Sequence, residues 1–426
     1  MFLREALYVP VTLVRQYLPA AALRRRRLRG INGMLAYARE RVPHYRDDER
    51  YAVPPLDSLD DLAGLPVLRK QTLRDRPQPD FLAEGTDPAR WRQFQTSGST
   101  GRRVLVRHDE RSHDYHMAAC FRRFLATGRY RPTDRLSHLR PYESPGRFFE
   151  KLKLFRRHTV LTRLPMDEIK AALLANRPQV LIGWPVHLRE LLRSLSPAEL
   201  AQLRRTLRLV FTESELLTPE IRARFTEGFG VPVRDEYSAF EVLNVYYECW
   251  AGGRHIAEDR VHVEIVDDEG RPLPDGAEGR LLVTAYMERA MPLLRYEIGD
   301  IGRIDPRPCR CGRTFRTLEL TRGRADDVVV LADGRKLYSD TFMWISAWHP
   351  GVAECFVQQD AAGRVRMSVV LQDPGADRGA VLDAVRAQLF ELVGGSFEID
   401  LVTAGELPVS AGGKGKLVAS EYRVGV

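Results

Sequence analysis

A run of small hydroxyl-bearing and glycine residues is the segment whose residue types point most directly to chemistry. It reads Thr96, Ser97, Gly98, Ser99, Thr100 and Gly101, and it follows Arg92–Gln95, a predicted strand end. A loop of this composition offers backbone N–H and hydroxyl donors with no bulk to exclude a polyphosphate. The lysine of a Walker loop is missing, so the P-loop NTPase pattern does not apply. The segment predicts a phosphate-binding loop, with a flexible surface loop as the alternative.

Two later segments could supply an aromatic face and two carboxylates. Asp235–Glu241 contains Tyr237 and, four residues further on, Glu241. Leu294–Asp300 ends in a Gly-Asp pair. The carboxylate of Asp300 could accept hydrogen bonds from ribose hydroxyls.

Two more segments lie toward the C-terminus. Gly323–Asp327 contains Arg324 and stands where a small C-terminal domain is expected to begin. Leu407–Lys414 places Lys414 on a Gly-rich loop near the end of the chain. Lys416 lies two residues on and is a rival for the same role.

The order of these motifs resembles the adenylate-forming superfamily of acyl-CoA synthetases, luciferases and non-ribosomal adenylation domains. It is most similar to the phenylacetate–CoA ligase and CapK-like branch, and the resemblance covers nearly the whole chain. Further segments fit this branch, namely Tyr37–Arg39, Val42–Arg46, Leu65–Lys70, Gly183–Leu188 and Met291–Tyr296.

The resemblance implies an ATP site in which the phosphate-binding loop holds the β- and γ-phosphates and releases pyrophosphate. It implies that Tyr237 stacks on adenine and that Glu241 helps to hold Mg²⁺. Glu215 matches the acidic residue on the loop beside the adenine. Asp300 would bind the ribose hydroxyls, and Arg324 would assist.

The resemblance also assigns roles near the C-terminus. Asp326 matches the hinge about which the C-terminal domain turns, and Lys414 would bridge the substrate carboxylate and the α-phosphate. The carboxylate and ATP are both anions, so positive charge is needed where the pentavalent centre forms, and one lysine with Mg²⁺ supplies it. Lys414 is favoured over Lys416 because it follows the glycine pair, as the family pattern requires.

The adenine motif departs from the family pattern at two positions. The usual Tyr-Gly-x-Thr/Ser-Glu reads Tyr-Ser-Ala-Phe-Glu here, with Ser238 for glycine and Phe240 for a hydroxyl residue. In relatives that hydroxyl reaches the AMP phosphate, and losing one such hydrogen bond costs about 1–3 kcal/mol. A non-catalytic relative with impaired nucleotide use therefore stays an alternative.

Four residues have the types of a tetrahedral zinc site. Cys309 and Cys311 form a Cys-x-Cys turn, and Cys249 and His255 lie in the neighbouring segment. Three thiolates and one imidazole suit Zn²⁺, and a closed set of four ligands would be structural rather than catalytic. Reduced thiols in adjoining loops are the alternative.

The expected reaction has two steps. A small carboxylic acid and ATP give an acyl-AMP and pyrophosphate, and a nucleophile then takes the acyl group. Coenzyme A is the first candidate for that nucleophile, and a carrier-protein thiol or an amine is the second. Trp184, Pro185 and Tyr142 are expected to line the acid site, but the acid itself cannot be read from the sequence.

Alternating strands and helices must position these residues. Val180–Gly183 and Leu207–Phe211 are predicted strands, Leu188–Leu195 is a predicted helix, and Pro219–Phe229 is a helix closed by Gly230. The alternation predicts an α/β fold with largely parallel sheets.

The pattern changes after Arg260. Val261–Val266 and Gly279–Thr284 are predicted strands of a β-rich subdomain of about residues 255–320, within an N-terminal domain of residues 1–324. Residues 325–426 are predicted to form a small, mobile α+β lid domain that carries Lys414. Its expected elements are Val328–Leu331, Ser339–Trp348, Met367–Leu371 and Ala380–Leu392.

Composition limits the class of protein. The 426 residues are 44% hydrophobic, which indicates a globular chain of more than one domain. The net charge of +8 comes from dispersed arginines, which argues against nucleic acid. The first twenty residues contain no run long enough to span a bilayer, and five cysteines are no disulfide framework, so a cytoplasmic location is expected. The oligomeric state, monomer or dimer, stays open.

Overall fold

The computed structural model describes residues 2–85, 87–95, 104–140, 153–324, 328–338, 351–393, 395–405 and 418–422, together with residues 341, 342, 345, 349 and 407. The chain divides into two compact units. The first holds Met1–Thr96, Arg103–Ile298 and Gly302–Glu319. The second holds Leu320–Val426 and Gly299–Ile301.

The helices, apart from short 3-10 turns, are α1 (Phe2–Arg15), α2 (Ala20–Arg41), α3 (Pro43–Arg46), α4 (Lys70–Asp75), α5 (Glu110–Ala126), α7 (Met166–Asn176), α8 (Pro185–Ser194), α9 (Pro197–Arg204), α10 (Pro219–Phe229) and α12 (Arg378–Val393). The strands are β1 (Arg92–Gln95), β2 (Leu105–His108), β3 (Leu136–Arg140), β4 (Arg157–Leu161), β5 (Val180–Gly183), β6 (Leu209–Thr212), β7 (Val233–Ala239), β8 (Leu243–Glu248), β9 (Arg254–Ile256), β10 (Val261–Val266), β11 (Gly279–Ala285), β12 (Leu293–Asp305), β13 (Thr317–Arg324), β14 (Val328–Val330), β15 (Lys336–Tyr338), β16 (Val352–Gln359), β17 (Val365–Leu371), β18 (Asp400–Thr403) and β19 (Val418–Ser420).

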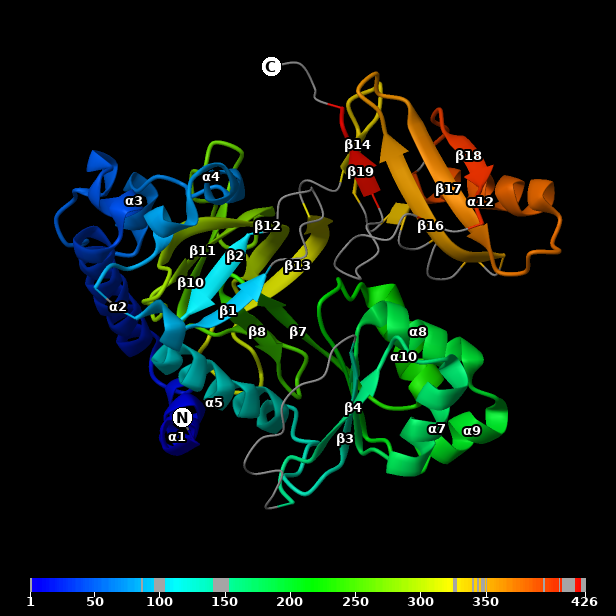
Figure 1. Ribbon diagram of the computed structural model, residues 1–426, viewed down its shortest axis with the longest axis horizontal. Coiled ribbons are helices and arrows are strands. Elements are labelled where there is room, and N and C mark those ends of the chain that lie inside the picture. The colour runs from blue at the N-terminus through cyan, green and yellow to red at the C-terminus, as the bar shows by residue number, and fades with distance from the viewer. Residues whose placement is uncertain are drawn as a thin grey trace. The chain divides into compact units, whose positions relative to one another are not determined.

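Parallel strands form one half of the main sheet. In the described residues the sheet order is β10-β11-β12-β13-β9-β8-β7-β6-β5-β3-β4, and β4, β3, β5, β6 and β7 run parallel. Helices α7 to α10 connect these strands and lie together on one side of them (Figure 1). Helix α10 ends at Gly230, whose φ of 70° is left-handed, as the sequence predicted. The predicted α/β class is confirmed.

Antiparallel strands β8 to β11 continue the same sheet. The predicted strands at Val261 and Gly279 pair as β10 and β11. All six residues of β10 are buried. Arg295 explains part of this burial: it pairs with Glu264 of β10 and donates to the carbonyls of Ala63 and Leu65, so residues before α4 cover the sheet here.

The N-terminal helices pack on the first unit. Helix α2 begins at Ala20 and buries Leu23, Ile31 and Leu35. Helix α1 packs against α5, where Arg15 Nη1 donates to the hydroxyl of Tyr115 at 2.8 Å.

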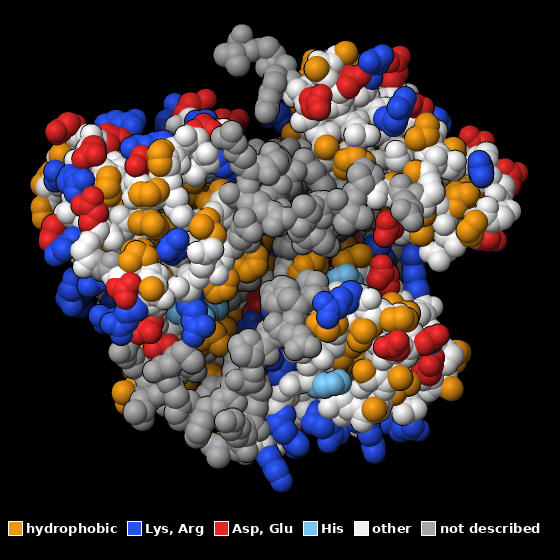
Figure 2. Space-filling view, in the orientation of Figure 1, with side chains coloured by type: hydrophobic (Ala, Val, Ile, Leu, Met, Phe, Trp, Pro, Cys, Tyr) orange, Lys and Arg blue, Asp and Glu red, His pale blue; other side chains and the backbone are white. Residues whose placement is uncertain are grey.

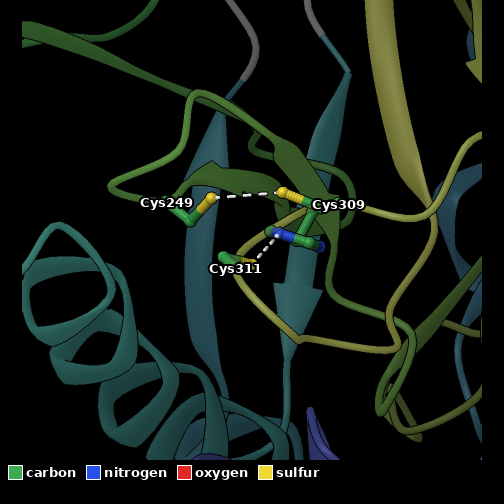
Figure 3. A group of neighbouring side chains, drawn as sticks. Cys249, Cys309 and Cys311 are labelled. Atoms are coloured by element: carbon green, nitrogen blue, oxygen red, sulfur yellow. Dashed lines mark hydrogen bonds between the residues drawn. The ribbon is translucent and has the colours of Figure 1, made fainter.

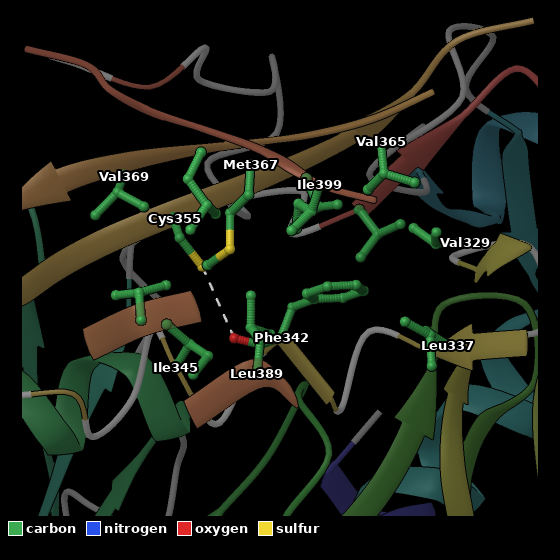
Figure 4. Close-up of a cluster of buried hydrophobic side chains, with 14 of the residues drawn as sticks. Val329, Leu337, Phe342, Ile345, Cys355, Val365, Met367, Val369, Leu389 and Ile399 are labelled. Atoms are coloured by element: carbon green, nitrogen blue, oxygen red, sulfur yellow. Dashed lines mark hydrogen bonds between the residues drawn. The ribbon is translucent and has the colours of Figure 1, made fainter. Parts of the chain in front are cut away.

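The second unit has a sheet of its own. Strand order is β18-β17-β16-β19, with β16 and β17 antiparallel and both outer strands parallel to their neighbours. Its core joins Cys355 and Met367 of the sheet to Phe342, Ile345 and Leu389 (Figure 4). The predicted strands at Val328 and Met367 and the helix at Ala380 are present, whereas most of Ser339–Trp348 lies outside the described residues.

Basic and acidic side chains are intermixed over much of the face shown in Figure 2, as the dispersed arginines indicated. Within the described chain, none of the helices has the length and apolar character needed to cross a bilayer.

Candidate nucleotide site

The structure places only part of the predicted site. The loop Thr96–Gly101, the hinge Asp326 and both candidate lysines, Lys414 and Lys416, lie outside the described residues, as does Tyr142. Their roles stay predictions.

Two predicted ribose ligands lie on strands. Asp300 lies within β12, half-buried, and Arg324 is the last residue of β13, with its side chain outside the described part.

A β-hairpin flanks the predicted phosphate-binding loop. Strands β1 and β2 pair antiparallel, with Gln95 opposite Leu105 and Arg92 opposite His108. The loop is the sequence between these two strands, so the hairpin fixes where the loop begins and ends. The predicted strand before the loop is confirmed.

The adenine motif begins in β7 and ends in the turn to β8. Tyr237 is half-buried, with its ring centroid 5.5 Å from that of Tyr246. The pairing of β7 with β8 shifts register between Tyr237 and Ser238, so a bulge re-aims the chain at the first departure from the family pattern. Phe240, the second departure, is 37% exposed and stacks on Phe94 of β1 with centroids 5.8 Å apart.

Glu241 is buried and held by two donors on one oxygen. Lys70 Nζ lies 2.8 Å from Oε1, and the hydroxyl of Tyr296 donates to the same atom at 3.0 Å. Burial alone would raise the pKa of this carboxyl, but the charge and hydrogen bond of Lys70, helped by Tyr296, lower the pKa below its usual value. Glu241 is therefore ionised at neutral pH, as an Mg²⁺ ligand must be.

The two sequence motifs that carry Lys70 and Tyr296 are joined through their backbones. The N–H of Leu68 donates to the carbonyl of Arg295 at 3.1 Å, and the N–H of Glu297 donates to that of Leu68 at 2.9 Å. These bonds place Lys70, at the start of α4, beside Tyr296. The sequence identified both segments as family motifs but did not predict that Lys70 pairs with Glu241. The position of Lys70 at the end of the motif Leu65–Lys70 was the one signal that could have suggested it.

The N-terminal motif reaches the same place. The hydroxyl of Tyr45, in the motif Val42–Arg46, donates to the carbonyl of Pro292 at 2.8 Å. Tyr45 is fully buried. The motifs Val42–Arg46 and Leu65–Lys70 thus both contact Met291–Tyr296, and the three segments together support the Glu241 site.

Glu215 holds the start of a helix. Its Oε2 accepts a hydrogen bond from the N–H of Val186 at 3.0 Å, in the first turn of α8, where a carboxylate also suits the helix dipole. Ser214 beside it has a φ of 73°, which is uncommon for a residue with a side chain. Trp184 and Pro185, predicted to line the acid site, lie at the same helix start, and both are buried.

Ionisable pairs that sequence reasoning missed lie near the carboxyl ends of the parallel strands. His138 of β3 donates from Nε2 to Glu213, just after β6, at 2.8 Å. Burial would raise the pKa of Glu213, but His138 outweighs it and the pKa falls to about 2. Arg123 of α5 forms an ion pair with Glu236 of β7. Ligands of open α/β sheets bind at this edge.

The four predicted zinc ligands come together. The ligand atoms of Cys249, His255, Cys309 and Cys311 all lie within 4.8 Å of one another. The sulfurs of Cys249 and Cys309 are 3.7 Å apart, and His255 Nε2 lies 3.1 Å from the sulfur of Cys311. Figure 3 shows Cys249 turned toward Cys309 and Cys311, which share one loop.

The chemistry of this set fits a metal. Tetrahedral Zn–S and Zn–N bonds of about 2.3 and 2.0 Å put ligand atoms roughly 3.5 Å apart, close to the separations observed. His255 Nδ1 donates to the carbonyl of Phe315 at 2.8 Å, which orients the ring so that Nε2 faces the cysteines. All five cysteines of the chain are free thiols.

Comparison with known proteins gives the family. The model of the AMP-binding enzyme family matches residues 69–287. The chain is 30% identical to a phenylacetate–coenzyme A ligase of Thermus thermophilus, over 93% of this chain and 96% of that protein. It is 28% identical to a phenylacetate–coenzyme A ligase of Aromatoleum evansii, over 72% of each chain.

A solved structure shares the fold. The crystal structure of a 2-hydroxyisobutyryl-CoA ligase in the postadenylation state has a TM-score of 0.78 and 20% identity, over 96% of this chain and 91% of that chain. The resemblance inferred from the motifs is confirmed. The chain belongs to the AMP-binding enzyme family and is an adenylate-forming ligase of the phenylacetate–coenzyme A ligase-like branch.

Proposed function

We propose that the protein activates a small carboxylic acid with ATP and transfers the acyl group to the thiol of coenzyme A. In the first step a carboxylate oxygen attacks the α-phosphorus, and the bond to pyrophosphate breaks. In the second, the thiol sulfur attacks the acyl carbon, loses its proton and releases AMP.

The ionised Glu241 carboxylate is the observation that carries this proposal. It is 4% exposed, and Lys70 and Tyr296 hold one of its oxygens. Buried carboxylates are costly, so this one favours a role in chemistry over a role in packing. It would hold Mg²⁺, which would neutralise phosphate charge, while Tyr237 would stack on the adenine.

The C-terminal residues complete the proposal. Residues 1–324 would form the nucleotide- and acid-binding domain, and residues 325–426 the lid. The lid would turn about Asp326 and bring Lys414 to the α-phosphate, where charge develops in the transition state. Asp300 and Arg324 would hold the ribose.

ATP–pyrophosphate exchange with a panel of carboxylic acids tests the first step. We expect exchange that depends on one class of acid and is lost in both Lys414→Ala and Glu241→Gln. Lys416→Ala serves as the matched control and should retain exchange. Absence of Mg·ATP binding by calorimetry would overturn the proposal in favour of a non-catalytic relative.

The acceptor is tested separately. Incubation of the acyl-adenylate with coenzyme A, with a phosphopantetheinylated carrier protein and with amines, followed by mass spectrometry, identifies which one is acylated. A coenzyme A thioester is expected, because the relatives compared above are named as coenzyme A ligases.

We also propose that Cys249, His255, Cys309 and Cys311 bind one structural Zn²⁺. It would join the turn after β8 to the loop between β12 and β13. That loop in turn holds the N-terminal helices, because Thr314 Oγ1 donates to the carbonyl of Leu18 at 2.6 Å. Free thiols of this kind suit a reducing, cytoplasmic setting.

A further inference from the structure

Three backbone carbonyls around Glu241 accept hydrogen bonds from two cationic side chains. His108 Nε2 donates to the carbonyl of Phe240 at 2.7 Å. Arg260 Nη1 donates to those of Val242 and Asn244, at 3.0 Å each. The carbonyls of every second residue from the turn into β8 are thus held. Glu241 lies between the first two of these residues, Phe240 and Val242.

One buried carboxylate joins both donors. Glu288 Oε2 lies 2.8 Å from His108 Nδ1, and Glu288 Oε1 lies 2.6 Å from Arg260 Nη2. Ser112 Oγ also donates to Oε2. All three charged side chains are 1% exposed, so water cannot replace these bonds.

The geometry settles the protonation of His108. One ring nitrogen faces a carboxylate oxygen and the other faces a carbonyl oxygen, so both must carry a proton. Burial lowers the pKa of His108, but Glu288 outweighs it and raises the pKa above its usual value, while the pKa of Glu288 falls to about 2. The anionic Glu288 therefore lies between two cations, His108 and Arg260.

His108 also belongs to the hairpin that flanks the predicted phosphate-binding loop. It is the last residue of β2 and pairs with Arg92 of β1. Phe94 of β1 stacks on Phe240, so the hairpin contacts the turn through a ring as well as through His108. Two segments of the nucleotide site, more than a hundred residues apart in sequence, are therefore held to each other by one imidazolium.

We propose that His108, Arg260 and Glu288 are positioning residues that fix the Phe240–Asn244 backbone, and with it the Glu241 carboxylate, against the hairpin of the phosphate-binding loop. The inference rests on the proposed function, because it takes Glu241 to serve Mg·ATP. The turn is held through its backbone carbonyls, so its position does not depend on the side chain of residue 240.

Affinity for Mg·ATP, measured by calorimetry, tests the inference without any need to know the acid. We expect His108→Gln and Glu288→Gln to weaken binding about 10-fold or more, since hydrogen bonds to charged groups are lost. His262→Gln is the control: it removes another buried histidine, on β10, whose charged neighbours are arginines outside the turn, and binding should stay within about 2-fold while stability falls. Ser112→Ala, which removes one donor to Glu288, replaces Glu288→Gln where that variant does not fold.

The pH profile separates positioning from general stability. Wild-type affinity should decline as pH rises through the pKa of His108, and this decline should be absent in His108→Gln. The charged and titratable groups near His108 are Glu288, Arg260, His113, His116 and Arg92, and His108→Gln retains all five. Wild-type affinity in folded His108→Gln and Glu288→Gln would overturn the inference, whereas a wild-type protein that binds no Mg·ATP would refute the proposed function itself.

Discussion

Lys70→Met should destabilise the protein through Glu241. The two side chains are 19% and 4% exposed, and Nζ lies 2.8 Å from Oε1. Removing one partner of a buried pair costs about 3–5 kcal/mol, and the residual exposure of Lys70 reduces this to about 2–3 kcal/mol. Adding Glu241→Gln to the Lys70→Met variant should restore most of the lost stability, because the double variant has no unpaired buried charge. The double variant should show a coupling energy of at least about 1 kcal/mol.

The pH dependence gives this prediction a sign. Lys70 lowers the pKa of Glu241, so its contribution to stability is present above the unfolded pKa and is lost as pH falls through the folded one. In Lys70→Met burial dominates and the pKa rises. The difference in unfolding free energy between wild type and variant should therefore be largest at neutral pH and shrink toward pH 4.

Urea unfolding of the wild type, both single variants and the double variant measures these quantities. Lys170→Met is the matched control: its lysine pairs with the 92% exposed Asp167 and, at 3.6 Å, with the partly exposed Glu199, so its loss leaves no buried charge and should change stability little. A coupling energy near zero, or a difference that does not depend on pH, would refute the assignment of Lys70 as the partner that keeps Glu241 ionised.

Three further predictions follow from separate parts of the first unit. The purified protein should contain about one zinc per chain by elemental analysis, and Cys311→Ser should lose it and melt at a lower temperature; metal-free wild type with unchanged melting would contradict the site. Gly279→Ala would place a Cβ 2.4 Å from the carbonyl oxygen of Val266 and should cost about 1–3 kcal/mol in denaturant unfolding, whereas Gly33→Ala, with open space around it, should not. Glu213→Gln should cost about 1–3 kcal/mol in urea unfolding, because it weakens the buried hydrogen bond from His138; unchanged stability would contradict the importance of this pair.

The sequence predicted best what depends on local pattern and on restrictive chemistry. Val180–Gly183 is a strand as predicted, because a short apolar run between helices suits the interior of a parallel sheet. The four candidate zinc ligands were found across some sixty residues because few other roles require three cysteines and a histidine in neighbouring segments.

Buried charges could not be predicted in the same way. His108, Arg260 and Glu288 look like ordinary surface residues in the sequence, since each type is usually exposed. Their burial depends on which strands become neighbours, and that is decided by the whole sheet. The same holds for the burial of both faces of β10, to which the residues before α4 contribute.

The motifs at Leu68 and Arg295 show how local sequence pattern and the packing of distant segments act together. Leu68 and Arg295 bond through their backbones, and this places Lys70 and Tyr296 on one oxygen of Glu241. The ionised state of that carboxylate is thus set by three segments distant in sequence. A scaffold that had lost nucleotide chemistry would gain more stability from an apolar residue at this buried position, because replacing a buried ion pair with hydrophobic residues is often stabilising. The retained pair therefore argues that this chain uses its nucleotide site.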